Sequence, residues 1–420
     1  MNCQLACPSC PTASGATDKA LGSGHLSVER FHELLDGNPQ IAEVELSNYG
    51  EMFLNPRLVE IMRIAHERTV VLHADNGVNL NHASDETLEA LVRYQFRSIR
   101  CSIDGANPET YSRYRVKGNF ERVIGHIRKI NSYKRQLRSG FPILRWQYIV
   151  FGHNEHEIEA ARKLAAELGM ELDLKLSWDP EFSPIRDREL VQIQLGGGSL
   201  TREEHYQSTG RDYMRAICYQ LWRAPVLNWD GRVVGCCRNF WGDFGANAFT
   251  DGLIASVNNE KMRHARAMLM GNAEERSDLP CTTCELYQTL KRDGQWLQED
   301  EIKEPDRRPG IQVSIVPIPA SSDVTQIGVA VLARHEMASL VQRMSLRLNW
   351  SRQNPARVQN FAVGSSFSIR TKLEPGEYTI CAFPLRADRK AWTRYLPQPL
   401  VTLPIRVAER PLAQEFQIIA

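Results

Sequence analysis

Residues 3–10 read Cys3-Gln-Leu-Ala-Cys7-Pro-Ser-Cys10, a C-x3-C-x2-C pattern with no fourth cysteine nearby. Three thiolates at this spacing lie in one loop and can hold one iron–sulfur cube while its fourth iron stays open. Ordinary electron-transfer cubes take four protein thiolates, and an open position is what distinguishes a catalytic zinc site from a structural one. The pattern therefore predicts a cluster that binds a further molecule. The alternative is a zinc site with His25 or a distant cysteine as fourth ligand.

The residues that follow, 26–178, alternate between helix-like and strand-like patterns. In the first helix-like stretch, apolar residues fall on one helical face: Val28, Phe31, Leu34 and Leu35. Strands that alternate with helices imply β-α units and a parallel sheet, an α/β fold. Ligands of α/β barrels gather at the carboxyl ends of the strands. The predicted strands are 41–50, 70–78, 97–105, 143–151 and 171–178.

Composition and net charge argue against several classes of protein. The chain has 420 residues, 42% of them hydrophobic, and a formal net charge of +1. A balanced charge argues against a nucleic-acid or membrane-surface partner, and no apolar run is long enough to span a bilayer. No secretory signal is visible, so the ten cysteines indicate a reducing, cytoplasmic location. There, clustered cysteines are metal ligands or catalytic groups more often than disulfides.

Polar and glycine residues recur where the predicted strands end. The segments are Asn48-Tyr49-Gly50-Glu51, Asp75-Asn76-Gly77 and Ser102-Ile103-Asp104-Gly105, the last followed by Arg115. Together with the three-cysteine loop, they resemble the radical S-adenosylmethionine (SAM) enzymes, over residues 1 to about 290. The resemblance implies that Cys3, Cys7 and Cys10 hold a 4Fe–4S cluster that cleaves SAM.

The same resemblance implies a set of residues that bind SAM. They are Tyr49, Gly50, Glu51, Asn76, Ser102, Asp104 and Arg115. The backbone at Gly50 would receive the SAM amino group, and Ser102 and Arg115 its carboxylate, for which an Arg fork is suited. Asp104 would lie near the ribose or the floor of the site. A solvated helix charge is the alternative for Arg115, and the sequence assigns no catalytic base.

The family's barrel also has a strand just before the cysteine loop. This chain begins at Met1, so the first strand of a partial (β/α)6 TIM-like barrel is missing or truncated. A lost strand would leave unpaired backbone groups. We therefore expect that the start codon has been assigned too late.

A second group of cysteines lies further along the chain. Cys218 and Cys236 flank the turn Trp229-Asp230-Gly231, and Cys281 and Cys284 form a C-x2-C pair. This stretch resembles the SPASM/twitch auxiliary-cluster module, and four thiolates can ligate one 4Fe–4S cube fully. Two alternatives stay open: a zinc ribbon, and Cys237 in place of Cys236.

These features predict four parts of the chain. Residues 1–189 form the radical SAM partial barrel, 190–217 a linker that contains a glycine run, and 218–299 the auxiliary-cluster module. Residues 308–420 carry short β-rich runs between turns, which suggests a C-terminal β-sandwich of unknown role.

The resemblance implies an oxidoreductase with two 4Fe–4S clusters and SAM as cofactors. A 5′-deoxyadenosyl radical would take a hydrogen atom from the substrate, and the auxiliary cluster would accept the remaining electron. The favoured substrate is a small polar molecule such as a sugar or an aminocyclitol. One alternative is a maturase that acts on a ribosomal peptide or protein. Another is a degenerate barrel that serves as a binding or scaffold protein. An external one-electron reductant such as flavodoxin or ferredoxin is the expected partner.

Overall fold

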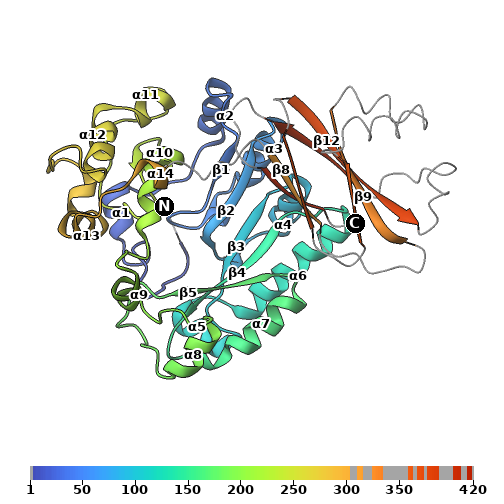
Figure 1. Cartoon of the computed structure of the whole chain (residues 1–420), viewed down its shortest axis with the longest axis horizontal. Coiled ribbons are helices and arrows are strands. Elements are labelled where there is room, and N and C mark those ends of the chain that lie inside the picture. The colour runs from blue at the N-terminus through green and yellow to red at the C-terminus, as the bar shows by residue number, and fades with distance from the viewer. Residues whose placement is uncertain are drawn as a thin grey trace. The chain divides into compact units, whose positions relative to one another are not determined.

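The computed structural model describes residues 3–302 and seven strands between residues 310 and 418 (Figure 1). The chain divides into two compact units, Met1–Tyr133 with Pro142–Glu304 and Lys134–Phe141 with Pro305–Ala420. In the described part of the chain, no helix is long and apolar enough to cross a membrane.

The first unit is built on a five-stranded parallel sheet in the order β1-β2-β3-β4-β5. The strands are β1 (Glu43–Glu45), β2 (Val71–Val78), β3 (Ser98–Ser102), β4 (Ile143–Val150) and β5 (Glu171–Leu176). The five strands predicted from the sequence and their parallel pairing are thus confirmed. The sixth strand of the prediction would precede residue 3 and lies outside the described residues, so closure of the barrel stays a prediction.

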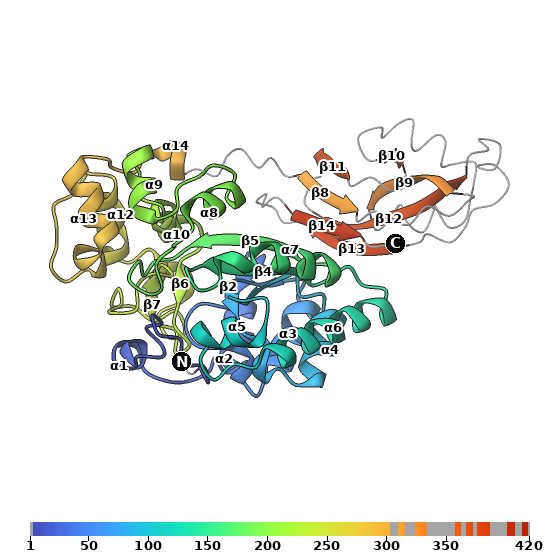
Figure 2. The ribbon, with the colours of Figure 1, turned by 90° about the horizontal axis from the view of Figure 1, so that it is seen from below.

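Amphipathic helices cover one face of this sheet (Figures 1 and 2). They are α3 (Leu58–Glu67), α4 (Asp85–Arg93), α6 (Phe120–Gln136) and α7 (Ile158–Glu167), with α2 (Val28–Gly37) before β1. Ser27 and Ser84 cap the starts of α2 and α4 by accepting hydrogen bonds from backbone N–H groups. The helices bury apolar stripes against Leu72, Ile99 and Trp146 of the sheet.

The opposite face of the sheet carries charged side chains. Because residues alternate along a strand, Arg145 falls between buried Leu144 and Trp146 on β4. Ion pairs cross this face, with 3.2 Å between Arg100 Nη1 of β3 and Asp173 Oδ2 of β5, two strands away. This face is therefore polar, in contrast to the core under the helices.

The stretch predicted as a linker, 190–217, contains helices. They are α8 (Arg188–Gln194) and α9 (Arg202–Thr209), followed by a 3₁₀ turn at Arg215–Tyr219. Each helix has an N-cap, since Asp187 accepts from Leu190 N at 3.0 Å and Thr201 from Glu204 N at 3.1 Å. The glycine run lies just past the end of α8, where Gly196 and Gly197 have positive φ. The predicted linker is therefore partly helical, and the domain boundaries stay predictions.

Small elements and a second core follow. They are α10 (Gln220–Arg223), β6 (Val226–Leu227), β7 (Val233–Gly235), α11 (Leu253–Val257), α12 (Glu260–Leu269), α13 (Glu285–Asp293) and α14 (Glu299–Ile302). The strands β6 and β7 pair as the predicted hairpin, and Gly231 in its turn has a φ of 91°. Such a positive φ favours glycine. Leu221, Val233 and Met262 are among the residues of the core.

The second unit consists of two sheets. One has the order β10-β9-β12-β13 and the other β11-β8-β14. The strands are β8 (Gly310–Ile315), β9 (Val324–Ala333), β10 (Val358–Ala362), β11 (Phe367–Lys372), β12 (Gly376–Arg386), β13 (Val401–Val407) and β14 (Gln414–Ile418). The all-β character agrees with the sequence, and the stacking of the sheets as a sandwich stays a prediction.

Gly152, just after β4, makes a close approach that can be tested. A Cβ on this residue would lie 1.9 Å from the backbone oxygen of Pro184, and Gly152 N donates to Ser183 O at 2.7 Å. We expect Gly152→Ala to destabilise the protein by about 1–3 kcal/mol, because the backbone must shift. Gly125→Ala in α6 is the control, since nothing lies within 4 Å of its Cβ. Alanine there should stabilise the helix by up to about 1 kcal/mol. Thermal unfolding checks both, and equal midpoints for the two variants would contradict the expectation.

Candidate functional site

The three-cysteine loop folds into one compact turn. Cys10 N donates to Cys7 O at 3.1 Å, and Ala6 N donates to Val116 O at 3.0 Å. Burial, together with Glu51, Cys7 and Cys10, raises the pKa of the Cys3 thiol to about 11. The three thiols therefore lie within electrostatic reach of one another in one loop. A thiolate donor set of this kind fits an iron–sulfur cluster.

Two polar side chains approach these sulfurs. Asn79 Nδ2 lies 3.7 Å from Cys3 Sγ, and Arg115 Nη1 lies 3.7 Å from Cys7 Sγ. Such contacts to a ligating sulfur tune the cluster and fix the orientation of its ligand. The structure thus brings Arg115 to the cysteine loop, as the sequence predicted.

Arg115 is also paired with a buried carboxylate. Its Nε donates to Asp104 Oδ2 at 2.5 Å, and Ile149 N donates to Asp104 Oδ1 at 2.7 Å. The Asp104 side chain is fully buried and the Arg115 side chain is 13% exposed. Burial raises the pKa of Asp104 although Arg115 opposes this shift. Arg115 is therefore not a solvated helix charge, and the alternative reading from the sequence is wrong.

Glu51, which follows β1, is linked to the cysteine loop through Asn79. Its Oε2 accepts from Asn79 N at 2.7 Å and from Asn79 Nδ2 at 2.6 Å, and its Oε1 accepts from Phe53 N at 3.1 Å. Burial raises the pKa of Glu51 to about 8. Since Asn79 contacts Cys3, the Glu51 side chain has a positioning role here. Its neighbour Gly50 has a φ of 83°.

Asn76 and Ser102 lie at the ends of neighbouring strands. Asn76 N donates to Ser47 Oγ at 3.2 Å, and its exposed side chain lines a cavity. Ser102 is buried, and its Oγ would lie 2.6 Å from a Cβ on Gly77. The close approach requires glycine at position 77, where φ is 116°. Both predicted residues thus face the carboxyl end of the sheet, and their contact with SAM stays a prediction.

The second cysteine group gathers from three separate segments. Cys218 lies in a 3₁₀ turn, Cys236 follows β7, Cys281 lies in the 3₁₀ turn Pro280–Thr283, and Cys284 caps α13. Burial raises the pKa of Cys218 well above its usual value, and the other three thiols add to the rise. The four sulfurs therefore lie within electrostatic reach of one another, and they fit one fully ligated cube.

Cys237 has other neighbours. Its N–H donates to Gln220 Oε1 at 2.7 Å, and the charged groups that act on its thiol are Glu45 and Arg238. Cys236 acts on Cys218 directly, so we favour it as the fourth ligand, and this assignment stays a prediction.

A cavity of about 450 Å³ lies between the β1 segment and the cysteine-bearing module. Apolar side chains make up most of its lining, among them Leu46, Met52 and Trp229. Tyr49 also lines it, and the Tyr49 ring meets the Phe240 ring edge-on at 5.9 Å. The thiols of Cys10 and Cys236 both act on the Tyr49 hydroxyl, so Tyr49 lies between the two cysteine groups.

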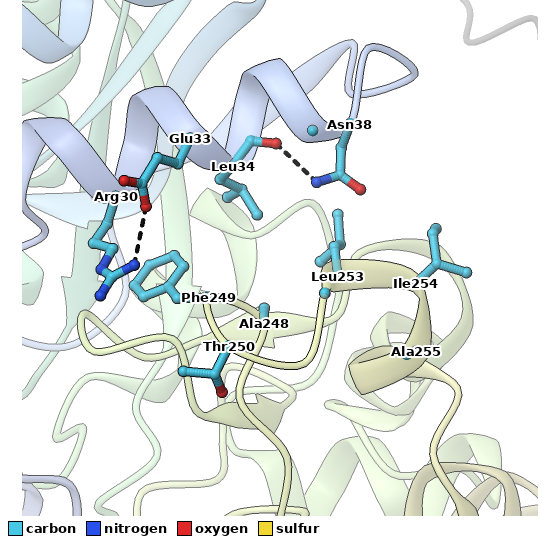
Figure 3. Close-up of a pocket in the computed structure, with 12 residues that line it drawn as sticks. Arg30, Glu33, Leu34, Asn38, Ala248, Phe249, Thr250, Leu253, Ile254 and Ala255 are labelled. Carbon is cyan, nitrogen blue, oxygen red and sulfur yellow. Dashed lines mark hydrogen bonds and ion pairs between the residues drawn. The ribbon is translucent and has the colours of Figure 1, made fainter.

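A second cavity, of about 420 Å³, lies between α2 and residues 248–255 (Figure 3). Arg30 and Glu33 pair at its rim, and Phe249 and Leu253 face it. It is lined by none of the nine cysteines that the structure describes. We therefore place the candidate site at the cavity beside Tyr49.

Known proteins resemble this chain over part of its length. No protein-family model matches it. The AdoMet-dependent heme synthase of Methanosarcina barkeri is 29% identical over 170 residues, which are 40% of this chain and 45% of that protein. The mycofactocin maturase MftC of Mycolicibacterium smegmatis is 25% identical over 173 residues, 40% of this chain and 41% of that protein. These comparisons support the assignment of the chain to the radical SAM superfamily.

The match to these curated relatives covers less than half of their length. Among solved structures, the crystal structure of Streptococcus suis SuiB has a TM-score of 0.45 with this chain. It is 12% identical and covers 69% of both chains.

Sequence reasoning missed one residue that contacts the cysteine loop, Asn79. Asn79 follows the predicted N-G segment and carries no motif, and only its three-dimensional contact with Cys3 reveals it. Asn154 and Glu157, two polar residues that follow β4, have structural roles. Asn154 Nδ2 donates to Asp104 O at 3.0 Å, and Glu157 Oε2 accepts from Ala106 N at 2.8 Å. The alternation of polar and apolar residues along β2 is the one sequence pattern that indicates the polar face of the sheet.

Proposed function

We propose that the protein is a radical SAM enzyme whose cluster site is the loop of Cys3, Cys7 and Cys10. The observation that carries this proposal is the convergence of the three sulfurs with Arg115 beside Cys7. A 4Fe–4S cluster with SAM bound there supplies a 5′-deoxyadenosyl radical. Such chemistry belongs to the cofactor, while the protein binds, orients and excludes water.

The surroundings of the loop suit this task. Leu5 and Cys7 pack with Tyr114 and Phe151, and the Phe151 ring is 4.7 Å from the Tyr114 ring. These side chains keep water away from one side of the site, which prevents side reactions of a radical. Arg115 offers a positive charge at the same place, and we propose that it and Ser102 bind the SAM carboxylate.

We further propose that Cys218, Cys236, Cys281 and Cys284 hold an auxiliary 4Fe–4S cluster. Four thiolates leave no open iron, so such a cluster carries electrons rather than substrate. With an electron acceptor near the cavity, the overall reaction would be an oxidation of the substrate. An external one-electron donor such as flavodoxin or ferredoxin would start each cycle.

The substrate that we propose is a peptide rather than a sugar. Sugars and aminocyclitols present many hydroxyl groups, and burying these against apolar side chains is costly. The cavity lining is mostly apolar, with Leu26, Val44 and Val257 beside the residues named above. The name of one relative, a maturase, agrees with a peptide. This proposal revises our expectation of a small polar molecule.

The experiment that tests the function is a SAM-cleavage assay. We expect anaerobically reconstituted protein, reduced with dithionite, to convert SAM to 5′-deoxyadenosine and methionine. Cys101→Ala is a matched control because Cys101 is buried in β3 beneath the helices, and the variant should retain the activity. Iron-loaded protein that forms no 5′-deoxyadenosine, or zinc in place of iron, would overturn the proposal.

A further inference from the structure

Three metal-ligating side chains meet on the polar face of the sheet, apart from the cysteines. Glu45 ends β1 and lies opposite His73 of β2, and Asp75 lies two residues further on β2. His73 Nδ1 is 3.1 Å from Glu45 Oε2 and 3.0 Å from Asp75 Oδ2. The three atoms lie within 4.8 Å of one another. Distances of 3.0–3.1 Å from His73 Nδ1 to the two carboxylate oxygens suit ligand atoms that share one first-row cation at bonds of about 2.0–2.2 Å.

The two carboxylates are held in place by further hydrogen bonds. Glu45 Oε1 accepts from Ser47 N at 2.7 Å and Ser47 Oγ at 2.6 Å, and Glu45 Oε2 accepts from Asp75 N at 2.8 Å. Ser98 Oγ lies 3.0 Å and 2.9 Å from the two oxygens of Asp75. Outer partners of this kind orient the ligands of a metal site.

We propose that Glu45, His73 and Asp75 bind a divalent cation. Two carboxylates and one imidazole form a set that suits Mn²⁺, Fe²⁺ or Zn²⁺ and does not suit a thiophilic ion. Three protein ligands leave coordination positions open. Glu45 also lines the cavity beside Tyr49, so the open positions would accept an oxygen donor from that side.

The charges around the site favour a bound cation. The side chains of Glu45, His73 and Asp75 are between 23% and 31% exposed, so water screens the two carboxylates only in part. Arg145, which acts on Asp75 from β4, opposes a cation, so the attraction comes from the two carboxylates. Within the described residues, no other group of three His, Cys, Asp or Glu side chains has ligand atoms this close together. None of the three side chains belongs to either cysteine group, although Glu45 acts on the Cys237 thiol, so the site goes beyond the proposed function.

Binding of Mn²⁺ to the reconstituted protein tests the inference. Mn²⁺ prefers carboxylate and imidazole ligands over thiolates, and its free ion gives an EPR signal that falls on binding. We expect one Mn²⁺ per chain in the wild type and none in Asp75→Asn at the same concentration. Ser98→Ala keeps all three ligands and should weaken binding by about 10–100-fold, as loss of an outer partner does.

Asp173→Asn on β5 is the matched control. Asp173 is also a partly buried carboxylate, but it pairs with Arg100 and Lys175 and has no imidazole beside it. Its variant should bind Mn²⁺ like the wild type. Protein cation sites at the weak end bind at about 1 mM. If the wild type binds no Mn²⁺ up to that concentration, the proposal is overturned. Hydrogen bonds of His73 would then be what holds the three side chains together. Equal binding by all four proteins would overturn it too. Neither result depends on SAM cleavage, so a failure here is distinguishable from a failure of the proposed function.

Discussion

A Cys3/Cys7/Cys10→Ala variant is expected to hold about four irons where the wild type holds about eight, four for each cube. It is also expected to form no 5′-deoxyadenosine. The physical reason is that these three sulfurs converge in one loop and raise one another's pKa. Replacing all three removes every thiolate within reach of that centre among the described residues. Iron and sulfide content after anaerobic reconstitution, followed by the SAM-cleavage assay, measures both effects.

The mirror variant, Cys218/Cys281/Cys284→Ala, separates the two centres. It should also lose about four irons, one full cube, but its three-cysteine loop is intact, so reductive cleavage of SAM should persist. A wild type that holds only about four irons would remove the auxiliary cluster from the proposal. Loss of all iron in either variant would show that the two centres do not form independently.

The sheet of the first unit was predictable because burial follows the strand period. On β4, Leu144, Trp146, Tyr148 and Val150 are buried and the residues between them are only partly so, and the sequence shows the same alternation. Short helices were harder to predict. The helix α9 buries none of its residues, so it has no apolar stripe to detect, and its N-cap at Thr201 is the local signal.

The candidate site was predictable as a set of residues but not as a network. Motif resemblance identified Arg115 and Asp104, yet their mutual ion pair depends on how the end of α5 (Pro108–Tyr114) folds back over the cysteine loop. The position of Tyr49 between two cysteine groups joins segments nearly 190 residues apart, residues 49 and 236. No local pattern encodes such a contact, because it depends on how whole elements pack.

The Asp104–Arg115 pair gives the second large effect. We expect Arg115→Ala to destabilise the protein by about 3–5 kcal/mol, because the buried carboxylate of Asp104 loses its partner. Asp104→Asn/Arg115→Gln removes both charges and should recover much of this loss, since replacing a whole buried pair costs less than breaking it. Chemical unfolding of the three proteins at pH 7 measures the order.

The loss of stability in Arg115→Ala should depend on pH in a definite direction. Burial raises the pKa of Asp104 in the folded protein above its unfolded value, and removing Arg115 raises it further. The stability that protonated Asp104 contributes is fully present below the pKa of Asp104 in the unfolded protein, about 3.9. It is lost as pH rises through the pKa of Asp104 in the folded protein. The deficit of Arg115→Ala relative to wild type should therefore be small at acid pH and grow toward neutral pH. The double variant should lack this growth. A deficit that stays constant with pH would mean that Arg115 stabilises the loop by packing rather than by its charge.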